Sequence, residues 1–515
     1  MFANIIFWIG YVALWAAVVR YDIHMFQHNS YRVERYARWY RSSSNILRPA
    51  LIMLLIAISF IPVYKSAVLT AIAVTMLIEA WREFRAEYKK PLVYTMRVWR
   101  MILSAAILSA AGVVAALYFI PEYAPAIAIG GLALPAVMLL ANFVNKPLEA
   151  AISRWYYNDA KHILRSMPDL KIIGVTGSFG KTSTKHYLYR ILSEKYNVLM
   201  TPGNFNTTLG VIRTVREHLK PHHQVFIVEM GAKQSNDIKE ICDLVHPTIG
   251  IVTAVGEMHL ETFKTVENIQ NTKFELINSL PADGLGVINN DSHCISSYKG
   301  ITSPCKLIRY AVEADGNYKA TDVKYGANGV SFTLNGGEQF GSRLLGVGNL
   351  LNILAATAVA DYLGVPTNKQ KNAIARLQPV EHRLSMKVSN GITVLDDAYN
   401  SNPQGAKMAL GVLKGFAVGD SNKRIVITPG FVEMGARQAQ ANKELGRTIA
   451  ESCDYAIVVN ATNRDAIRSG IEEGGMAAEK YFLADSLNHA HAHLAQILKA
   501  GDVVLYENDL PDNFK

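Results

Sequence analysis

Two shortages mark this sequence of 515 residues: it has few cysteines, and it has too few acidic residues to balance its basic ones. The cysteines lie far apart, with no C-x-x-C pair and no histidine at metal-ligand spacing. This argues against a disulfide framework or a zinc knuckle and favours reduced cytosolic thiols. The net charge is +9 and 50% of the residues are apolar, a combination typical of nucleic-acid-binding or membrane proteins. The four cysteines are Cys242, Cys294, Cys305 and Cys453.

The shortage of acidic residues is confined to the first part of the chain. Residues 1–150 contain 14 Lys and Arg but 7 Asp and Glu, so they carry +7 of the net charge, and the remaining 365 residues carry +2. The larger part therefore has too little surplus charge for a basic surface that binds nucleic acid, and we expect no nucleic-acid partner.

The first 146 residues contain long apolar stretches, as expected of a membrane domain. Each stretch is close to the roughly 20 residues that a helix needs to cross hydrocarbon, and together they predict about five transmembrane helices. In an alternative, residues 50–80 form one re-entrant hairpin, which leaves the topology of the rest unchanged. The stretches are Ala3–Val19, Ala50–Tyr64, Ser66–Ala80, Met101–Ile120 and Ala124–Val144.

Two basic segments between these stretches predict the orientation. They cover residues 20–48 and 82–100, whereas the other connections are nearly uncharged. By the positive-inside rule the basic segments are cytoplasmic, so we expect an N-terminus outside, catalytic domains in the cytoplasm after Lys146, and a multi-pass protein of the inner (plasma) membrane. A cleaved signal peptide is disfavoured, because four more apolar stretches follow and no basic n-region precedes the first. Beyond topology, the arginines could also contact anionic lipid or substrate headgroups.

After Pro147, short β-rich runs alternate with helical stretches, which predicts an α/β fold with a largely parallel sheet. A strand at residues 171–175 leads into a glycine-rich loop, TGSFGKTST at residues 176–184, and then a helix through Leu192. Such a loop turns backbone N–H groups toward phosphate, while its lysine and hydroxyl supply a cation and a Mg²⁺ ligand. The strict G-x-x-x-x-G-K-[ST] pattern is not met, since Val175 stands at its first glycine, but the Lys-Thr pair favours a nucleoside triphosphate over a dinucleotide. The nucleotide-binding candidates are Gly177, Ser178, Gly180, Lys181, Thr182 and Ser183.

Three further residues follow predicted elements of the same region. Glu229 ends a strand at residues 224–228, where a carboxylate beside a phosphate loop suits Mg²⁺. His259 follows a strand at residues 249–253, and Lys273 lies in a predicted helix. Spacing alone assigns neither of these two a role.

Together these motifs resemble the Mur ligase family. The resemblance covers about residues 170–505 and depends on five ordered motifs: GVTGSFGKT at 174–182, EMGA at 229–232, HLE at 259–261, Lys273, and DDAYNSNP at 396–403. It implies a P-loop central ATPase domain and a Rossmann-like C-terminal domain, with expected boundaries at 1–146 for the membrane domain, 147–380 and 381–515. It further implies an ATP-dependent ligase that activates a carboxylate as an acyl phosphate for attack by an amine. Within the family the motifs are most similar to the branch that adds D-alanyl-D-alanine to a peptidoglycan precursor in cell-wall synthesis.

The resemblance also implies roles for the residues around the phosphates. Lys181 would contact the β- and γ-phosphates, and Thr182 and Glu229 would ligate Mg²⁺. His259 would hold a second Mg²⁺, and Lys273 resembles the carbamylated lysine of the family, which provides a carboxylate-like oxygen donor. Lys181, Lys273 and His259 are therefore the expected catalytic residues.

Other motifs resemble the parts of the family that hold nucleotide and substrates. In GVGNLLN at residues 346–352, Asn349 and Asn352 match the G-x-H-N-x-x-N segment near the adenine, although Gly348 replaces the histidine. Arg383 and Asp397 would hold the γ-phosphate and the ribose when the domains close. Asn206 falls in a segment similar to N-N-x-I-G and is a weaker substrate-binding candidate. The incoming amine would meet Tyr399, Asn400 and Asn402.

Two departures from the family concern the acceptor. The membrane stretches occupy the place of the domain that grips UDP, and the K-G-S-R run expected after a G-D-V-V-L strand is replaced by YENDLP at residues 506–511. The acceptor is then either a small-molecule precursor or a lipid-linked or non-peptidoglycan carboxylate, with an amino acid or dipeptide as the amine. Two other classes remain open: a transport or signalling ATPase, disfavoured by the near absence of intramembrane charge, and a scaffold with a decayed ATPase half, disfavoured by the retained motifs.

Overall fold

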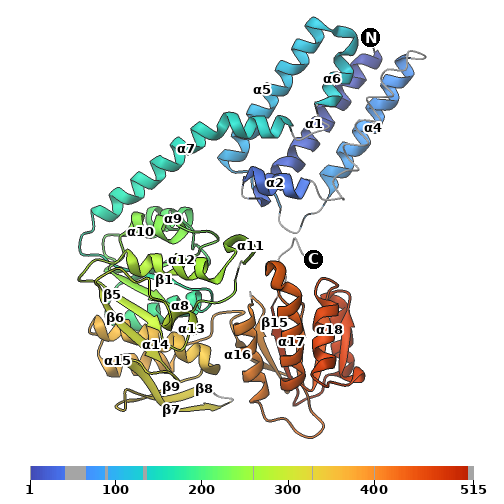
Figure 1. Cartoon of the computed structure of the whole chain (residues 1–515). Coiled ribbons are helices and arrows are strands. Elements are labelled where there is room, and N and C mark those ends of the chain that lie inside the picture. The colour runs from blue at the N-terminus through green and yellow to red at the C-terminus, as the bar shows by residue number, and fades with distance from the viewer. Residues whose placement is uncertain are drawn as a thin grey trace. The chain divides into compact units, whose positions relative to one another are not determined.

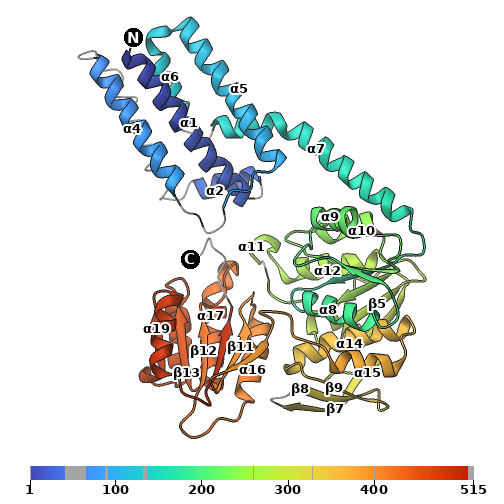
Figure 2. The same ribbon diagram turned by 180° about the vertical axis from the view of Figure 1, so that it is seen from behind.

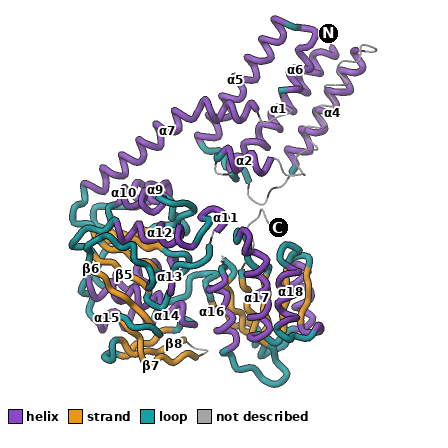
Figure 3. The backbone as a smooth tube through the Cα atoms, in the orientation of Figure 1, coloured by secondary structure: helices purple, strands orange, loops and turns teal. Residues whose placement is uncertain are grey.

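The computed structural model describes most of the chain and divides it into two compact units, Met1–Tyr156 and Tyr157–Lys515 (Figure 1). The first unit is helical in its described part, and the second alternates strands and helices, as the colouring in Figure 3 shows. The described residues are 2–29, 31–40, 65–86, 88, 91–131, 136–258, 260–326, 329–399 and 401–508.

Apolar side chains hold the helices of the first unit together in two clusters. One joins α1 to α4 through Phe7, Leu14 and Ile72. The other joins α1 to α2, α5 and α7 through residues that include Ile23 and Met101. The elements are α1 (Phe2–His28), α2 (Val33–Tyr40), α4 (Lys65–Arg85), α5 (Met96–Phe119), a 3₁₀ turn (Pro121–Tyr123), α6 (Ala124–Gly130) and α7 (Ala136–Arg165).

Two helices in the described part of the chain are long and apolar enough to cross a membrane, by length and composition alone: Ala3–His28 and Met96–Phe119. Of the five expected apolar stretches, Ala3–Val19 and Met101–Ile120 correspond to these two helices. Ser66–Ala80 lies in α4, which fails the same criteria because its last turns are charged. Ala124–Val144 is divided between α6 and α7 rather than forming one helix. Ala50–Tyr64 lies outside the described residues, as do Arg41, Arg48, Lys89 and Lys90 of the basic segments.

The second unit contains a nine-stranded sheet in the order β2-β3-β1-β4-β5-β6-β7-β8-β9. The strands from β2 to β7 pair in parallel, and β7, β8 and β9 pair antiparallel. Parallel order brings the carboxyl ends of β1, β3 and β4 to one edge, where ligands of α/β proteins bind. The strands are β1 (Lys171–Thr176), β2 (Val198–Met200), β3 (Val225–Glu229), β4 (Ile249–Val252), β5 (Leu285–Asn289), β6 (Lys306–Ala311), β7 (Tyr318–Gly326), β8 (Gly329–Leu334) and β9 (Gln339–Ser342).

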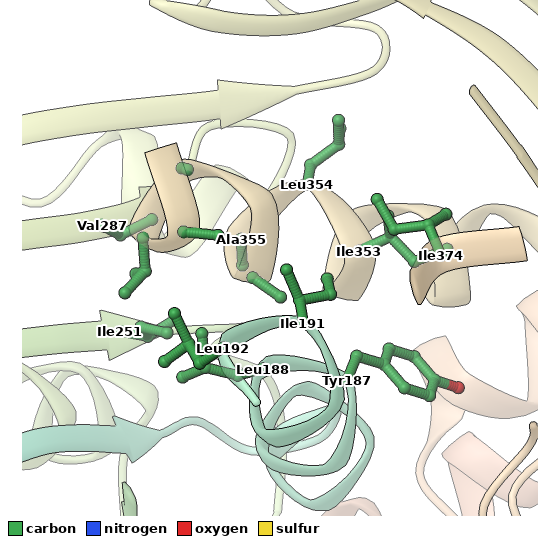
Figure 4. Packing of buried hydrophobic residues seen from close by; sticks show 14 of the residues in the cluster. Tyr187, Leu188, Ile191, Leu192, Ile251, Val287, Ile353, Leu354, Ala355 and Ile374 are labelled. Atoms are coloured by element: carbon green, nitrogen blue, oxygen red, sulfur yellow. The ribbon is translucent and has the colours of Figure 1, made fainter. Parts of the chain in front are cut away.

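Helices cover both faces of this sheet. On one face, α8 and α14 pack together and bury Leu188, Ile191 and Ile353 against strand residues such as Ile251 (Figure 4). On the other face, Leu276 of α12 lies over Gly174, where an added Cβ would stand 2.6 Å from the leucine side chain. The helices are α8 (Lys181–Leu192), α9 (Thr208–His218), α10 (Asp237–Val245), α11 (Leu260–Phe263), α12 (Val266–Asn278), α13 (His293–Ser296), α14 (Gly346–Tyr362) and α15 (Thr367–Ala375).

A six-stranded sheet follows in the order β10-β11-β15-β12-β13-β14, with β10 antiparallel and the other pairs parallel. Helices α16, α17 and α18 cover one face and α19 the other, as Figures 1 and 2 show from opposite sides. The expected α/β class is thereby confirmed. The elements are β10 (Ser385–Ser389), β11 (Ile392–Asp397), α16 (Pro403–Lys414), β12 (Arg424–Thr428), a 3₁₀ turn (Gly435–Arg437), α17 (Gln438–Ser452), β13 (Tyr455–Val459), α18 (Arg464–Glu473), a 3₁₀ turn (Ala478–Lys480), β14 (Tyr481–Ala484), α19 (Leu487–Ile497) and β15 (Val503–Glu507).

Candidate nucleotide and metal site

The glycine-rich loop lies between β1 and α8, as the sequence predicts. Gly177 and Gly180 have φ angles of 150° and 81°, a range that glycine adopts without strain. An added Cβ at Gly177 would stand 2.1 Å from Oγ1 of Thr253, so that position also lacks room for a side chain. Thr253 follows β4, and its hydroxyl donates to the carbonyls of Phe179 and Thr176. The residue that follows β4 therefore holds the loop through hydrogen bonds.

Lys181 begins α8 and folds back over the loop. Its Nζ donates to the carbonyl oxygens of Gly177 at 2.7 Å and Ser178 at 3.1 Å. Burial lowers the pKa of Lys181 to about 8, with Glu229 opposing and Arg383 adding to the effect. A cation held by two backbone carbonyls of the phosphate loop is suited to an incoming phosphate.

Glu229 ends β3 beside the loop, with 1% of its surface exposed. Oε1 accepts from the hydroxyl of Thr182 at 3.3 Å and from Nδ2 of Asn206 at 3.2 Å, and Oε2 lies 2.9 Å from Nζ of Lys185. Burial by itself would raise the pKa of Glu229, but Lys185 and Lys181 together hold it below its ordinary value. The carboxylate is therefore ionised and has one oxygen directed at the loop.

This donor set fits Mg²⁺. The ion prefers hard oxygen ligands and is usually held by one or two carboxylates together with phosphate oxygens and water. The hydroxyl of Thr182 and Oε1 of Glu229 provide two such oxygens next to the phosphate loop. Among the described residues, no group of three or more His, Cys, Asp or Glu side chains could hold a metal ion.

The remaining two residues expected to act on metal are placed differently. Lys273 lies on α12 and is 4% exposed. Burial lowers its pKa to about 7, and Lys181 adds to this while Asp237 and Glu275 oppose it. His259 lies outside the described residues, between Met258 and the start of α11.

A pocket beside the loop gathers most of the expected nucleotide-binding residues. Its lining combines the phosphate loop, the start of α14, the segment between the two sheets and the start of α16. Of the expected residues it contains Gly180, Ser183, Asn349, Asn352, Arg383, Asp397 and Asn402. Residues from both α/β sheets therefore meet at one site.

The two asparagines of α14 also hold helices together. Oδ1 of Asn349 accepts from the hydroxyl of Tyr187 at 2.7 Å, and Oδ1 of Asn352 accepts from Thr184 at 3.0 Å. Nδ2 of Asn349 donates to the carbonyl of Leu345 at 2.9 Å. Their amides are thus partly committed to packing α8 against α14.

Arg383 and Asp397 are partly buried and lie near each other. The guanidinium of Arg383 stands 4.1 Å from the ring centroid of Tyr399, and Oδ1 of Asp397 accepts from the backbone N–H of Leu384 at 3.0 Å. Burial raises the pKa of Asp397 to about 6, and the charge of Arg383 works against this rise. Burial likewise lowers the pKa of Arg383, while Asp397 raises it.

Two of the residues expected to receive the amine, Tyr399 and Asn402, lie just before α16. Tyr399 is half-exposed, whereas Asn402 is buried and caps the helix, its Oδ1 accepting from the N–H of Gly405 at 3.0 Å. Asn400 lies outside the described residues. Asn402 therefore both caps α16 and lines the pocket.

Three residues of the site were not predicted from the sequence. Lys185 lies one turn beyond Lys181 and is fully buried. Its i,i+4 spacing from Lys181 was the sequence signal that could have placed it on the same side of the helix. Thr253 supports the loop only because β4 pairs with β1. Asn289 ends β5 and donates to the carbonyl of Thr253 at 2.9 Å, and it also lines the pocket. Only pairing between distant strands brings Thr253 and Asn289 to the loop.

A phosphate loop, oxygen ligands suited to Mg²⁺ and a pocket shared by two α/β sheets define an enzyme that uses a nucleoside triphosphate. Comparison with known families makes the class specific: the model of the Mur ligase middle domain matches residues 175–360, and that of the Mur ligase glutamate ligase domain matches residues 382–506. The chain belongs to the Mur ligase family and is an ATP-dependent ligase that forms peptide bonds.

Similar proteins support this assignment. The UDP-N-acetylmuramoyl-tripeptide--D-alanyl-D-alanine ligase of Bacillus subtilis (strain 168) is 28% identical over 349 residues, which cover 65% of this chain and 72% of that protein. The ligase of the same name from Mycobacterium tuberculosis (strain ATCC 25618 / H37Rv) is 30% identical over 362 residues, or 65% and 70% of the two chains. The structure of the MurF ligase from Thermotoga maritima in complex with ADP is similar, with a TM-score of 0.61 and 26% identity, covering 69% of this chain and 80% of that one.

Proposed function

We propose that the protein joins D-alanyl-D-alanine, or a similar amine, to the terminal carboxylate of a peptidoglycan precursor. The observation that carries the proposal is the shared pocket, in which Gly180 and Ser183 of the phosphate loop meet Arg383 and Asp397. The relatives named as D-alanyl-D-alanine ligases support the choice of amine. The precursor in those names is a UDP-N-acetylmuramoyl tripeptide.

The reaction consists of two transfers. The carboxylate oxygen of the acceptor attacks the γ-phosphorus of ATP, which forms an acyl phosphate and releases ADP. The amine then attacks the acyl carbon, loses a proton and displaces inorganic phosphate. Lys181 neutralises charge on the transferring phosphate. Arg383 and Asp397 hold the γ-phosphate and the ribose, and closure of the domains keeps water from the acyl phosphate.

We assign Thr182 and Glu229 to one Mg²⁺ and His259 to a second. Bound there, Mg²⁺ supplies positive charge to the phosphate oxygens. Lys273 would carry a carbamate, an oxygen ligand formed from its amine and carbon dioxide. Its burial on α12 among groups that include Asp237 and Glu275, together with the family resemblance, supports this assignment.

We assign different residues to the acceptor and to the amine. Asn206, beside Glu229, would contact the acceptor. Tyr399, Asn400 and Asn402 would contact the amine. Gly177, Ser178 and Asn349 complete the set that would hold ATP.

The proposed domain boundaries are 1–146 for a membrane domain, 147–380 for the central domain and 381–515 for a Rossmann-like C-terminal domain. The two family models, which cover residues 175–360 and 382–506, support the division between the α/β domains. The two apolar helices of the first unit support attachment to the plasma membrane with the α/β domains in the cytoplasm.

A second candidate is the same reaction on a lipid-linked acceptor. The matched family region begins at residue 175, and the preceding unit is helical in its described part, with two helices suited to a membrane. An acceptor carried by lipid would be delivered at the membrane surface, where a tethered enzyme meets it.

Phosphate release by the detergent-purified protein tests both candidates. ATP is supplied with UDP-linked or lipid-linked precursor and with D-alanyl-D-alanine, D-alanine or L-amino acids, and products are identified by mass spectrometry. We expect phosphate release that depends on one acceptor–amine pair, with a ligated product. Phosphate release independent of every pair, without ligated product, would instead favour a transport or signalling ATPase.

Lys181→Ala tests the role of the phosphate loop, and Lys195→Ala is its control. We expect Lys181→Ala to reduce phosphate release by at least about 100-fold, since it removes a preorganised cation from the transferring phosphate. Lys195→Ala removes an exposed lysine that contacts the carbonyls of Leu363 and Gly364, and should leave phosphate release unchanged. Equal activity in both variants would contradict the assignment of the loop.

A further inference from the structure

Lys185 is a fully buried cation that the reaction described above does not use. It lies on α8 one turn beyond Lys181, with 0% of its surface exposed. Its Nζ lies 2.9 Å from Oε2 of Glu229 and donates to the carbonyl of Gly203 at 2.7 Å. The side chain thus connects the end of β3 to the loop that follows β2.

Stability alone is a weak reason for such a pair. Removing an ammonium and a carboxylate from water costs several kcal/mol per ion, so a buried ion pair often contributes no more than apolar side chains of the same volume. The pair instead divides the two oxygens of Glu229 between different tasks. Lys185 holds Oε2, and Oε1 remains directed at the hydroxyl of Thr182.

The loop of residues 201–207 is held against the same carboxylate. Nδ2 of Asn206 donates to Oε1 of Glu229 at 3.2 Å, and the carbonyl of Asn206 accepts from the N–H of Gly231 at 2.7 Å. An added Cβ at Gly231 would stand 2.8 Å from Cγ of Asn206, so the loop lies directly on the strand end. With the bond from Lys185 to Gly203, the loop is held at two points, Gly203 and Asn206.

We propose that Lys185 is a positioning residue: it fixes the orientation of Glu229 toward the metal ion and couples that carboxylate to the loop of residues 201–207. The proposal extends the proposed function, since it takes Glu229 as a metal ligand and Asn206 as a contact of the acceptor. A change at Lys185 should therefore alter metal affinity and acceptor binding together, although Lys185 contacts neither.

Binding of Mn²⁺ to the full-length protein saturated with ADP, followed by electron paramagnetic resonance, tests the first part. We expect Lys185→Met to weaken Mn²⁺ binding by about 10-fold or more, as is usual when a partner of a metal ligand is removed. Affinity for ADP without metal should change by less than about 3-fold, because the ammonium of Lys185 contacts Glu229 and Gly203 and the residue does not line the pocket. Lys195→Met, which removes a lysine with two backbone carbonyl partners, should leave both affinities unchanged.

A double-substitution cycle separates positioning from a general loss of structure. In a Glu229→Gln protein, adding Lys185→Met should weaken Mn²⁺ binding by less than about 2-fold, because the two residues act through one contact. The doubly substituted protein carries no unpaired buried charge, so it remains a test if Lys185→Met alone fails to fold. Additive losses in the cycle, or wild-type Mn²⁺ affinity in a folded Lys185→Met protein, would overturn the proposal.

The second part is tested by the KM for the acceptor that supports ligation. Lys185→Met should raise this KM by more than it raises the KM for the amine, whereas an equal change in both would overturn the coupling to the loop. The Mn²⁺ measurement needs neither substrate. It therefore stands if the ligation assay identifies a different acceptor or no ligation at all.

Discussion

Three lysines within one α/β unit illustrate how position determines the chemistry of a side chain. Lys181 and Lys273 have lowered pKa values, because burial removes water from their ammonium groups. Lys185 is fully buried and has a carboxylate partner in Glu229. The first can serve a phosphate, the second can present a neutral amine, and the third orients a neighbour.

Lys273→Ala should lower ligation by at least about 10-fold, since it removes a proposed oxygen ligand from the metal site. If Lys273 carries a carbamate, added formate or acetate should restore part of the ligation activity of Lys273→Ala by occupying the place of the carbamate. Activity is measured as phosphate release with and without the added carboxylate. Lys239→Ala on α10, which removes an exposed lysine paired with Asp243, serves as the control and should show neither loss nor rescue.

Glu507 predicts a pH dependence of stability. It ends β15, accepts from the hydroxyls of Ser401 and Thr428, and burial raises its pKa to about 8. The folded protein therefore binds a proton that the unfolded chain releases at its ordinary carboxyl pKa near 4.5. This contribution to stability is complete at low pH and is lost as the pH rises through about 8, by at most about 1.4 kcal/mol for each pH unit between the two pKa values.

The measurement compares the midpoint of thermal unfolding of the wild type and Glu507→Gln between pH 5 and pH 8. The wild type should lose stability relative to the variant as the pH rises, because the amide cannot ionise. Asp397, whose pKa burial raises to about 6, has a dependence of the same sign but is present in both proteins. Parallel pH curves for the two proteins would contradict the buried protonated carboxyl.

At the scale of elements, strand pairing determines how well the phosphate loop is supported. The sequence predicts strands at 171–175, 224–228 and 249–253, and the structure confirms each to within one residue. These predictions hold because each run is buried on both faces of a parallel sheet and is therefore continuously apolar. The contact of Thr253 with the loop has no such local signal, since it depends on β4 pairing with β1.

Gly177→Ala tests this support. The added methyl group would overlap Thr253, so we expect the loop to shift and ATP affinity to fall by at least about 10-fold, the effect of losing about 1.4 kcal/mol. Gly411→Ala in α16 meets no atom within 4 Å and should leave ATP affinity unchanged, with a small gain in helix stability. Equal ATP affinities in calorimetric titrations of the two variants would show that the loop tolerates a side chain at residue 177.

At the scale of the whole molecule, the chain combines a helical unit with an α/β unit that contains the matched family region. The surplus of basic residues lies almost entirely in the first of these, and so does the pair of long apolar helices. Helix α5 exposes apolar side chains along its length, among them Leu103 and Ile107. Such a surface is suited to lipid.

The full-length protein should therefore remain with membranes after an alkaline carbonate wash and be released by detergent. Ile107→Arg, near the centre of α5, should move protein into the soluble or aggregated fraction, because an arginine at the centre of a spanning helix costs about 2.5–3.5 kcal/mol. Val388→Arg in β10 alters an equally exposed apolar residue of the α/β unit and should not change the distribution. Full extraction of the wild type by carbonate would contradict the membrane assignment.

The sequence by itself determined the class and the chemistry of this protein. Its phosphate loop, the strand-end Glu229 and the run from Asp396 to Pro403 are local patterns, whose meaning follows from residue type and spacing along one element. Apolar content alone did not show that the stretch after Pro121 divides between two helices, α6 and α7.

Only the tertiary structure decided which residues meet. Arg383 and Asp397 reach the pocket of the phosphate loop across about 200 residues of sequence, and Lys185 contacts Glu229 because β3 pairs with β1. Burial then lowers the pKa of Arg383 and raises that of Asp397, an effect that depends on every neighbour and not on the residue alone. Contacts between distant elements, and the water they exclude, have no signature in a local pattern.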